Sequence, residues 1–219
     1  MIIYYYDEFD SVDDAVIASM VQRMPQQQAE LVTSRKMLSQ KRKQAVSFDM
    51  LAYALANNKE EATSRDLFIR HFPFAELIAS LSVLDAPIHF RFGDKGKPYL
   101  VENNDIWFNI SHCREAIVTA VSNREVGVDA EGRRRYSDHL LERCYSEQER
   151  QSVHDSADSE NEFARIWTRK EAFFKWTGTG ILTDHIKTVE EDAKRAGCAI
   201  ETLEVTKNDG NSFFLSIAE

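Results

Sequence analysis

The clearest hydrophobic pattern in the chain is a stripe at helical spacing between Phe163 and Ile181. At about 100° per residue, the large apolar side chains of this stretch fall on one arc of a helix. They are Phe163, Ile166, Trp167, Phe173 and Phe174. The run Gly178-Thr179-Gly180 that follows is expected to end the helix, because glycine suits the left-handed position after a last turn.

Three charged residues interrupt or border this apolar arc. Lys170 lies inside it, and Glu171 and Lys175 follow at its margin. A buried charge is costly unless another group pairs with it, so Lys170 is expected to have a partner. The alternative is an ordinary amphipathic helix, in which Glu171 and Lys175 form a surface ion pair worth about a few tenths of a kcal/mol.

The remaining pattern predicts a mixture of helices and short strands. In the first half, we expect strands at 2–6, 88–92 and 106–110 and helices at 11–24, 34–57 and 63–81, the last interrupted near Pro73. Strands at 116–121 and 126–131, joined by a turn at 122–125, are expected to form a hairpin. Beyond them we expect helices at 137–144 and 146–154 and strands at 186–189, 200–205 and 213–217, the last two joined by a turn at 208–211.

These elements indicate an α+β protein. A chain of 219 residues can form one large domain or two of roughly 100 to 120 residues. The change of pattern near residue 122 predicts an N-terminal lobe over 1–122 and a C-terminal lobe over 123–219. No low-complexity linker separates them, so the lobes are expected to pack closely.

Composition narrows the possible functions. The net charge of -9 argues against general nucleic-acid binding, which favours a basic surface. The three cysteines are far apart and odd in number, which excludes a closed disulfide framework and fits a reducing compartment. The first residues lack the basic start of a signal peptide, and no run is long and apolar enough to span a membrane. A cytoplasmic, soluble monomer is expected.

The strand at 126–131 carries two acidic residues. Period two places Val126, Val128 and Ala130 on one face and Asp129 and Glu131 on the other, with Gly127 expected to leave open space beside them. One interpretation is the solvent face of an edge strand. The other is a divalent-cation site completed by Glu171 from the helix; all-oxygen ligands favour Mg²⁺ or Mn²⁺ over zinc.

Candidate phosphate contacts precede this strand. Ser111 and His112 follow a predicted strand, and Lys97 lies in a turn between Gly96 and Pro98. Alone, a histidine near a strand end is more often a surface or hydrogen-bonded residue than a ligand, and a single GKP is weak evidence of a phosphate contact. The basic first part of the helix at 34–57 is either a solvated face or an anion-binding edge. No P-loop and no dinucleotide-binding glycine motif is present.

The order of several motifs along the chain points to a protein family more specifically than any single motif does. They are GKP at 96–98, FNISH at 108–112, VGVDAE at 126–131, YSEQE at 145–149, WTRKEAFFK at 167–175 and GTGI at 178–181. Together they resemble the 4'-phosphopantetheinyl transferases of the surfactin-synthetase-activating type. The resemblance covers residues 96–181; the first 95 residues match only loosely, and Tyr145 stands where the family usually has Phe.

The resemblance implies a fold and a reaction. The fold would consist of two similar α/β lobes related by a pseudo-two-fold axis, with the active site at the interface between them. The reaction would move the 4'-phosphopantetheine group of coenzyme A to a serine of an apo acyl or peptidyl carrier protein. It would depend on Mg²⁺, with Mn²⁺ as a substitute, and would release adenosine 3',5'-bisphosphate.

The resemblance also implies residue roles. The metal ligands would be Asp129, Glu131 and Glu171. The coenzyme A contacts would be Lys43, Lys97, Ser111, His112, Lys170 and Lys175. The residues acting on the reacting groups would be Glu149 as the base for the carrier serine, with Lys175 and His112 neutralising phosphate charge.

The partner of such an enzyme is an acidic carrier protein. A chain with net charge -9 would need a local basic patch to bind it, and Arg133 to Arg135 is the candidate, an exposed loop without a partner being the alternative. No nucleic acid and no membrane partner is expected. The alternative to the transferase is a non-catalytic coenzyme A or nucleotide-binding module of the same fold; a further alternative is an interaction protein with no metal dependence.

Overall fold

The computed structural model describes residues 1–80, 88–101, 103–181 and 184–219. It contains both helices and strands, as expected for an α+β protein, and the chain divides into two compact units. The first unit comprises residues 1–93, 98–110 and 116–125, and the second comprises 94–97, 111–115 and 126–219. The chain passes from the first unit to the second for the last time after residue 125, close to the predicted lobe boundary at 122. Two short earlier segments also belong to the second unit.

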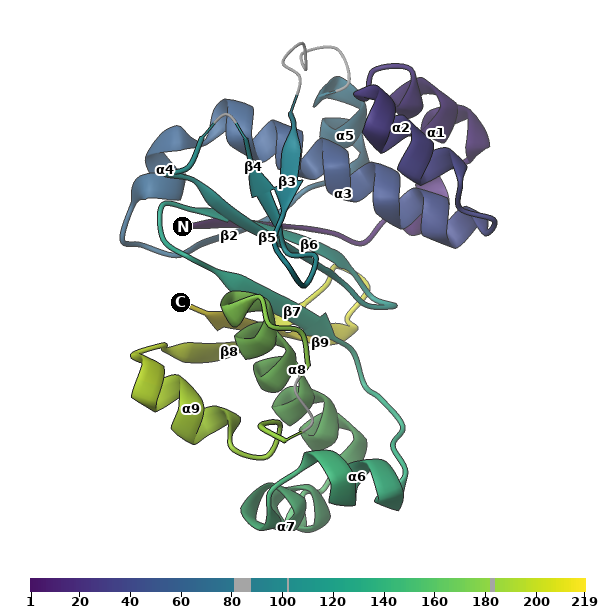
Figure 1. Ribbon diagram of the computed structural model, residues 1–219. Coiled ribbons are helices and arrows are strands. Elements are labelled where there is room, and N and C mark those ends of the chain that lie inside the picture. Colours follow the sequence, from purple (N-terminus) through teal and green to yellow (C-terminus); the bar gives the residue numbers. More distant parts are fainter. Residues whose placement is uncertain (81–87, 102, 182–183) are drawn as a thin grey trace. The chain divides into compact units, whose positions relative to one another are not determined.

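The first unit is built on a four-stranded sheet in the order β2-β1-β6-β5 (Figure 1). Its strands are β1 (Ile2–Tyr6), β2 (Phe68–His71), β5 (Trp107–His112) and β6 (Ile117–Ser122), and a separate ribbon pairs β3 (Phe90–Phe92) with β4 (Pro98–Leu100). The helices of this unit are the 3-10 turn η1 (Phe9–Ser11), α1 (Asp14–Val21), α2 (Gln26–Thr33), α3 (Leu38–Asn57), α4 (Lys59–Thr63) and α5 (Phe74–Ser80).

Helix α3 and the strands β1 and β6 enclose the core of the first unit. Met50 and Leu51 of α3 and Ile2 of β1 are completely buried there. Apolar burial of this kind stabilises by about 25 cal/mol per Å². The predicted helix at 34–57 is confirmed, with its start four residues later than expected.

The expected helix at 63–81 is wrong in its first half. Residues 68–71 form strand β2, which pairs in parallel with β1, Ile2 lying opposite Phe68. Pairing with a strand far away in the sequence overrides local helix preference, because strand formation depends on neighbouring strands. The helix begins only after Pro73, as α5, and residue 81 lies outside the described residues.

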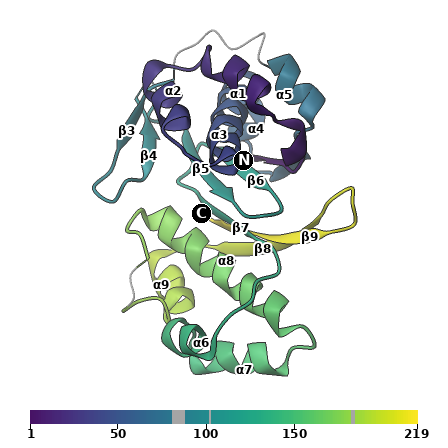
Figure 2. The same ribbon diagram turned by 90° about the vertical axis from the view of Figure 1, so that its right-hand side faces the viewer.

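The second unit consists of a three-stranded antiparallel sheet and its helices. The sheet order is β7-β9-β8, and its strands are β7 (Gly127–Glu131), β8 (Ile200–Thr206) and β9 (Ser212–Ala218). The helices are α6 (Asp138–Cys144), α7 (Glu147–Asp155), α8 (Ser159–Thr177) and α9 (Val189–Ala196). Helix α8 lies along this sheet (Figure 2) and contacts all its strands.

The hairpin expected at 116–131 does not form. Strand β6 lies between β1 and β5 in the first sheet, whereas β7 pairs with β9 in the second. The chain bends after Ser122, but the two strands then pair with distant strands in different sheets. Every residue of β6 is buried, which a two-stranded ribbon could not achieve.

The strand expected at 186–189 does not form, because residues 184–187 make a turn and helix α9 begins at Val189. The β-branched residues favoured a strand, but Val189 instead starts a helix whose first turn carries Glu190, Glu191 and Asp192. Acidic side chains are favourable near the positive end of a helix dipole. The strands at 200–205 and 213–217, their connecting turn and the helices at 137–144 and 146–154 are confirmed.

Helix α8 has the burial that the apolar stripe predicts. Phe163, Ile166, Trp167, Phe173 and Phe174 are all buried, and Gly178 ends the helix with φ 67°. Phe163 also lies in a stack of rings: its ring centroid is 4.7 Å from that of Tyr136 and 4.7 Å from that of Tyr145, and Trp167 lies parallel to it. None of the helices in the described part of the chain is long and apolar enough to cross a membrane.

Candidate active site in the second unit

Three of the sequence motifs meet at the carboxylate of Asp129. Ser111 at the end of β5 donates its hydroxyl to Asp129 Oδ1 at 2.7 Å. Lys175 on α8 donates from Nζ to the same oxygen at 2.7 Å and to Ser111 Oγ at 2.9 Å. Ser111 also accepts the backbone N–H of Ala130 at 3.2 Å. These residues lie in the second unit, which joins FNISH, VGVDAE and WTRKEAFFK in one hydrogen-bonded cluster.

The other two predicted metal ligands are electrostatically coupled to Asp129. Burial, followed by the charges of Asp129 and Glu171, raises the pKa of Glu131 from its ordinary value near 4.5 to about 7. Burial and then Asp129 raise the pKa of Glu171 as well. A raised carboxyl pKa means that the surroundings disfavour the charged carboxylate. A bound cation would offset the repulsion among these like charges.

The cluster has a free acceptor for such a cation. Asp129 is 5% exposed, and its Oδ2 is buried without a hydrogen-bond partner among the described residues. An unsatisfied buried carboxylate oxygen is costly, and a divalent cation would satisfy it. The interpretation of 126–131 as a solvent-facing edge strand therefore fails for Asp129. The donor set is entirely oxygen, which fits Mg²⁺.

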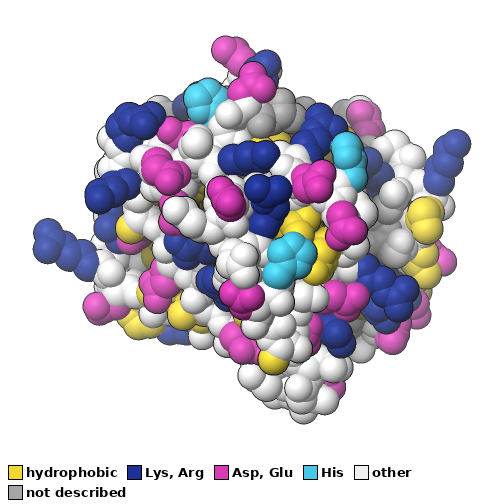
Figure 3. All heavy atoms as spheres, turned by 90° about the horizontal axis from the view of Figure 1, so that it is seen from below, with side chains coloured by type: hydrophobic (Ala, Val, Ile, Leu, Met, Phe, Trp, Pro, Cys, Tyr) yellow, Lys and Arg dark blue, Asp and Glu magenta, His cyan; other side chains and the backbone are white. Residues whose placement is uncertain are grey.

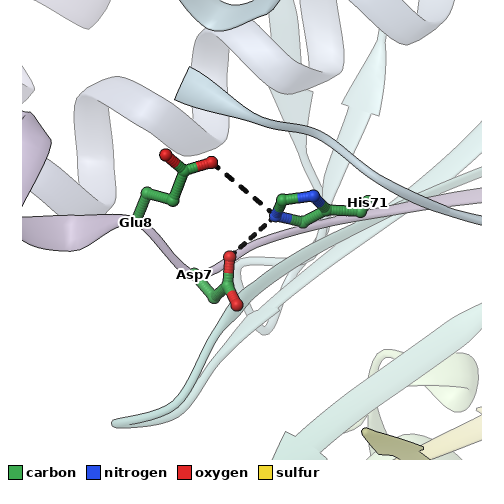
Figure 4. A group of neighbouring side chains, drawn as sticks. All are labelled: Asp7, Glu8 and His71. Carbon is green, nitrogen blue, oxygen red and sulfur yellow. Dashed lines mark hydrogen bonds and ion pairs between the residues drawn. The ribbon is translucent and has the colours of Figure 1, made fainter. Parts of the chain in front are cut away.

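A different group of three possible metal ligands lies closer together than Asp129, Glu131 and Glu171. Among the described residues, only Asp7, Glu8 and His71 have ligand-type atoms that all lie within 4.8 Å of one another (Figure 4). His71 Nε2 is 2.7 Å from Asp7 Oδ1 and 3.8 Å from Glu8 Oε1, and Glu8 Oε1 accepts the backbone N–H of Phe74 at 3.0 Å. The sequence analysis did not identify this trio. Its contacts tie the ends of β1 and β2 to the start of α5.

Gly127 has a different role from the one expected. A Cβ atom added there would lie 2.2 Å from the carbonyl oxygen of Ala172 and 2.3 Å from the backbone nitrogen of Trp176. The space beside Gly127 is thus filled by the backbone of α8, and the expectation of open space is wrong. Only glycine permits this approach, which fixes the helix carrying Glu171 and Lys175 against the strand carrying Asp129.

Lys170 has the partner that its buried position requires. It is 2% exposed, and its Nζ lies 2.6 Å from Glu149 Oε1 and donates to the carbonyl of Ile186 at 2.7 Å. Burial lowers the pKa of Lys170, and Glu149 opposes that shift. Glu149 Oε2 accepts the N–H of Ser146 in the capping box of α7. The roles predicted for Glu149 as a base and for Lys170 in coenzyme A binding stay predictions.

The other predicted phosphate contacts lie in different places. Lys97 is buried and donates from Nζ to the carbonyl of Trp176 in the last turn of α8 at 2.7 Å. His112 is an exposed residue at the end of β5. Lys43 lies half-buried on α3 in the first unit. Nothing in these positions tests a contact with coenzyme A, so all three assignments stay predictions.

The arginine run beside β7 is paired with acids of its own unit. Arg133 Nε lies 3.0 Å from Glu160, Arg135 lies 3.9 Å from the same carboxylate, and Arg134 Nη1 donates to Glu131 at 2.9 Å. One face of the molecule likewise shows basic and acidic side chains interspersed (Figure 3). Arg133 and Arg135 stay largely exposed in these ion pairs, so the role of the run in binding an acidic carrier protein stays a prediction. The ion pair with Glu131 was not foreseen from the sequence.

Comparison with known proteins finds a match over the part of the chain that carries most of this cluster. Residues 125–214 match the sequence model of the 4'-phosphopantetheinyl transferase superfamily. The matched residues include β7, α8 and their acidic side chains. This part of the chain is therefore similar to the 4'-phosphopantetheinyl transferase superfamily. The resemblance expected from the motifs, to this superfamily and to its surfactin-synthetase-activating type, is thereby confirmed.

Individual members of the superfamily match about half of this chain. The 4'-phosphopantetheinyl transferase gsp of Aneurinibacillus migulanus is 34% identical over 53% of this chain and 47% of its own length. Sfp of Bacillus subtilis is 27% identical over 54% of this chain and 58% of its own. AcpT of Escherichia coli O157:H7 is 36% identical over 40% and 47%. The chain thus spans about half the length of the curated relatives it matches.

Proposed function

We propose that this protein transfers the 4'-phosphopantetheine group of coenzyme A to a serine of an apo acyl or peptidyl carrier protein. The observation that carries the proposal is the meeting of Ser111, Asp129 and Lys175 at one carboxylate oxygen, from motifs far apart in the sequence. A protein in which these residues were ordinary surface groups would not bury them together. The curated relatives carry the same activity in their names.

The proposed metal site consists of Asp129, Glu131 and Glu171. Support comes from the unpartnered Asp129 Oδ2 and from the raised pKa values of the two glutamates. A bound Mg²⁺ would neutralise phosphate charge, the main requirement of this kind of transfer. The metal ligands lie on β7 and α8, whose contact at Gly127 limits movement between them.

The chain's own residues would bind and align the two substrates. Lys175 and Ser111 present an ammonium and a hydroxyl beside Asp129, and both groups can donate to phosphate oxygens. His112, Lys97, Lys43 and Lys170 are the further proposed contacts to coenzyme A. The serine oxygen of the carrier would form a new bond to phosphorus, and adenosine 3',5'-bisphosphate would leave.

Proton removal from the carrier serine is assigned to Glu149. Both of its carboxylate oxygens are engaged, one with Lys170 and the other with the N–H of Ser146. Each oxygen has a second lone pair, so these contacts orient Glu149 and leave it able to accept a proton from a substrate within hydrogen-bonding reach. The transfer of the proton can be tested separately from binding, because a Glu149→Gln variant keeps an acceptor and a capping group but loses the basic carboxylate.

The remaining features of the proposed enzyme concern the whole chain. We propose that the two units are similar in architecture, supported by the presence in each of a sheet covered by one long helix, α3 or α8. The enzyme would act as a cytoplasmic monomer on an acidic carrier protein.

Mass spectrometry of the carrier tests the proposal. The protein is incubated with coenzyme A, Mg²⁺ and several apo carrier proteins, and the expected result is a mass gain of one phosphopantetheine group on one of them. No gain on any carrier would contradict transferase activity. Binding of coenzyme A without transfer would instead support the non-catalytic module.

Glu171→Ala provides the matched test of the metal site. The loss of one metal ligand should reduce Mg²⁺-dependent transfer about 100-fold or more, since a metal supplies several kcal/mol of charge stabilisation. Circular dichroism checks that the fold survives. Full activity with unchanged Mg²⁺ dependence in the folded variant would refute the assignment of Glu171.

A further inference from the structure

Arg134 makes two contacts that link the proposed metal ligands to the aromatic core of the second unit. Its Nη1 donates to Glu131 Oε1 at 2.9 Å. Its guanidinium carbon lies 5.1 Å from the centroid of the Trp167 ring. Trp167 belongs to the same helix as Glu171, four residues earlier, so the two side chains lie on neighbouring turns. Arg134 therefore lies between one acidic ligand and the helix that carries another.

The charge of Arg134 acts on two of the proposed ligands. It lowers the pKa of Glu131 and that of Glu171, against the raising effects of burial and of Asp129. On the other side of the cluster, Lys175 lies 2.7 Å from Asp129. Two cations thus compensate three carboxylates in the protein as it stands. Lys175 contacts Oδ1 of Asp129 and leaves Oδ2 available to a metal, whereas Arg134 must release Oε1 of Glu131 before that oxygen can bind one.

The Arg134 side chain can move away from Glu131. Its side chain is 38% exposed, and that of Glu131 is 23% exposed, so water can replace the ion pair. Cation–π contacts and exposed ion pairs are each worth only about 1 kcal/mol. Arg134 can release Glu131 while it stays on the Trp167 ring, whereas the buried Lys170 has no comparable freedom.

We propose that Arg134 is a positioning residue: a built-in counter-ion that holds Glu131 in the metal-free protein and yields this carboxylate to a divalent cation. The inference rests on the proposed function, because it takes Asp129, Glu131 and Glu171 as the metal site. Arg134 contacts neither substrate in this proposal. Its effect is to lower metal affinity and to stabilise the acidic cluster when no metal is bound.

Arg134→Gln tests the proposal through metal binding alone. Mg²⁺ is titrated into the protein by calorimetry without coenzyme A or carrier. Removal of an ion pair of this exposure should tighten Mg²⁺ binding about two- to fivefold, because the cation no longer competes with the guanidinium. Arg135→Gln is the matched control: Arg135 is 96% exposed and lies 3.9 Å from Glu160, so Mg²⁺ affinity should not change.

Two further readouts separate positioning from a merely structural role. The metal-free Arg134→Gln variant should have a lower melting temperature than wild type, and Mg²⁺ should raise the melting temperature more in the variant than in wild type. Tryptophan emission should change when Mg²⁺ binds wild type, because the guanidinium beside the Trp167 ring loses its carboxylate partner. This contribution should be absent from Arg134→Gln although Mg²⁺ still binds. A structural defect alone would lower both melting temperatures equally.

The outcomes are distinct. Equal or weaker Mg²⁺ binding by folded Arg134→Gln would overturn the inference and leave the proposed metal site intact. Absence of Mg²⁺ binding to wild type would contradict the metal site of the proposed function, and the inference with it. If Arg134→Gln does not fold, Arg134→Lys, which keeps the charge but lacks the planar fork, should tighten binding in the same direction by less; unchanged affinity would then count against the inference.

Discussion

Among single residues, Lys170 shows how a buried charge is compensated in this chain. Its ammonium has a carboxylate and a backbone carbonyl as partners, and it faces the Tyr145 ring at 5.4 Å. Tyr145 donates its own hydroxyl to the carbonyl of Phe163 at 2.8 Å, which explains how a tyrosine is accommodated where the family usually has Phe. The apolar arc predicted the burial of Lys170. The identity of its partners required the fold.

Lys170→Met should destabilise the protein by about 3 kcal/mol, because it leaves Glu149 without its counter-ion at a largely buried site. The double variant Lys170→Met/Glu149→Gln should recover much of that loss, since Gln keeps the capping box of α7 and carries no charge. Urea unfolding of the wild type, the two single variants and the double variant measures this coupling. Additive effects would show that the ion pair does not matter for stability.

The raised pKa of Glu131 has a consequence for stability. The folded protein holds a proton on Glu131 up to about pH 7, whereas the unfolded chain releases it near 4.5. Stability therefore falls as pH rises from about 4.5 to about 7. Melting temperatures of metal-free wild type should drop more between pH 5 and pH 7.5 than those of Glu131→Gln. Identical pH profiles would contradict the assigned shift.

At the level of elements, the position of α8 on β7 decides the geometry of the site. The sequence shows why each element forms: the apolar stripe for α8 and the alternating pattern for β7. It does not show that they touch at Gly127, because a glycine in a strand is equally compatible with a bulge or an open site. For the same reason the pairing of β6 and β7 was predicted wrongly. Strand pairing depends on distant partners, which local patterns do not contain.

Gly127→Ala should therefore destabilise the second unit by about 1–3 kcal/mol and disturb the cluster at Asp129, since its Cβ would meet the backbone of α8. Gly132→Ala is the matched comparison, because there a Cβ would meet only the side-chain end of Glu115, which can rotate away. Thermal unfolding should show the larger loss for Gly127→Ala. Equal losses would mean that the approach of α8 to β7 is not tight.

Over the whole molecule, the chain passes between its two units five times, after residues 93, 97, 110, 115 and 125. The sequence pattern predicted a division near 122 because the element types change there. It could not predict that 94–97 and 111–115 belong with the C-terminal unit, because such short segments have no pattern of their own. The candidate residues Lys97, Ser111 and His112 lie in these segments, so the domain boundary predicted at 122 places them in the wrong unit.

A fragment of residues 123–219 should consequently fold poorly. It lacks Ser111, which donates to Asp129, and Lys97, which donates to the last turn of α8. A fragment starting at residue 94 contains both segments of the second unit that 123–219 lacks and is the matched comparison. Amide hydrogen exchange should show weaker protection of β7 and α8 in the shorter fragment. Equal protection in both would show that these contacts are dispensable.

The stacked rings of Tyr136, Phe163, Tyr145 and Trp167 have an optical consequence. Aromatic groups held parallel at fixed distances, here with interplanar angles of 10° and 22° for the two pairs at 4.7 Å, contribute to near-ultraviolet circular dichroism only while their packing is intact. All four belong to the unit that carries the acidic cluster. Near-ultraviolet circular dichroism therefore reports whether the core of that unit is packed, without any added label.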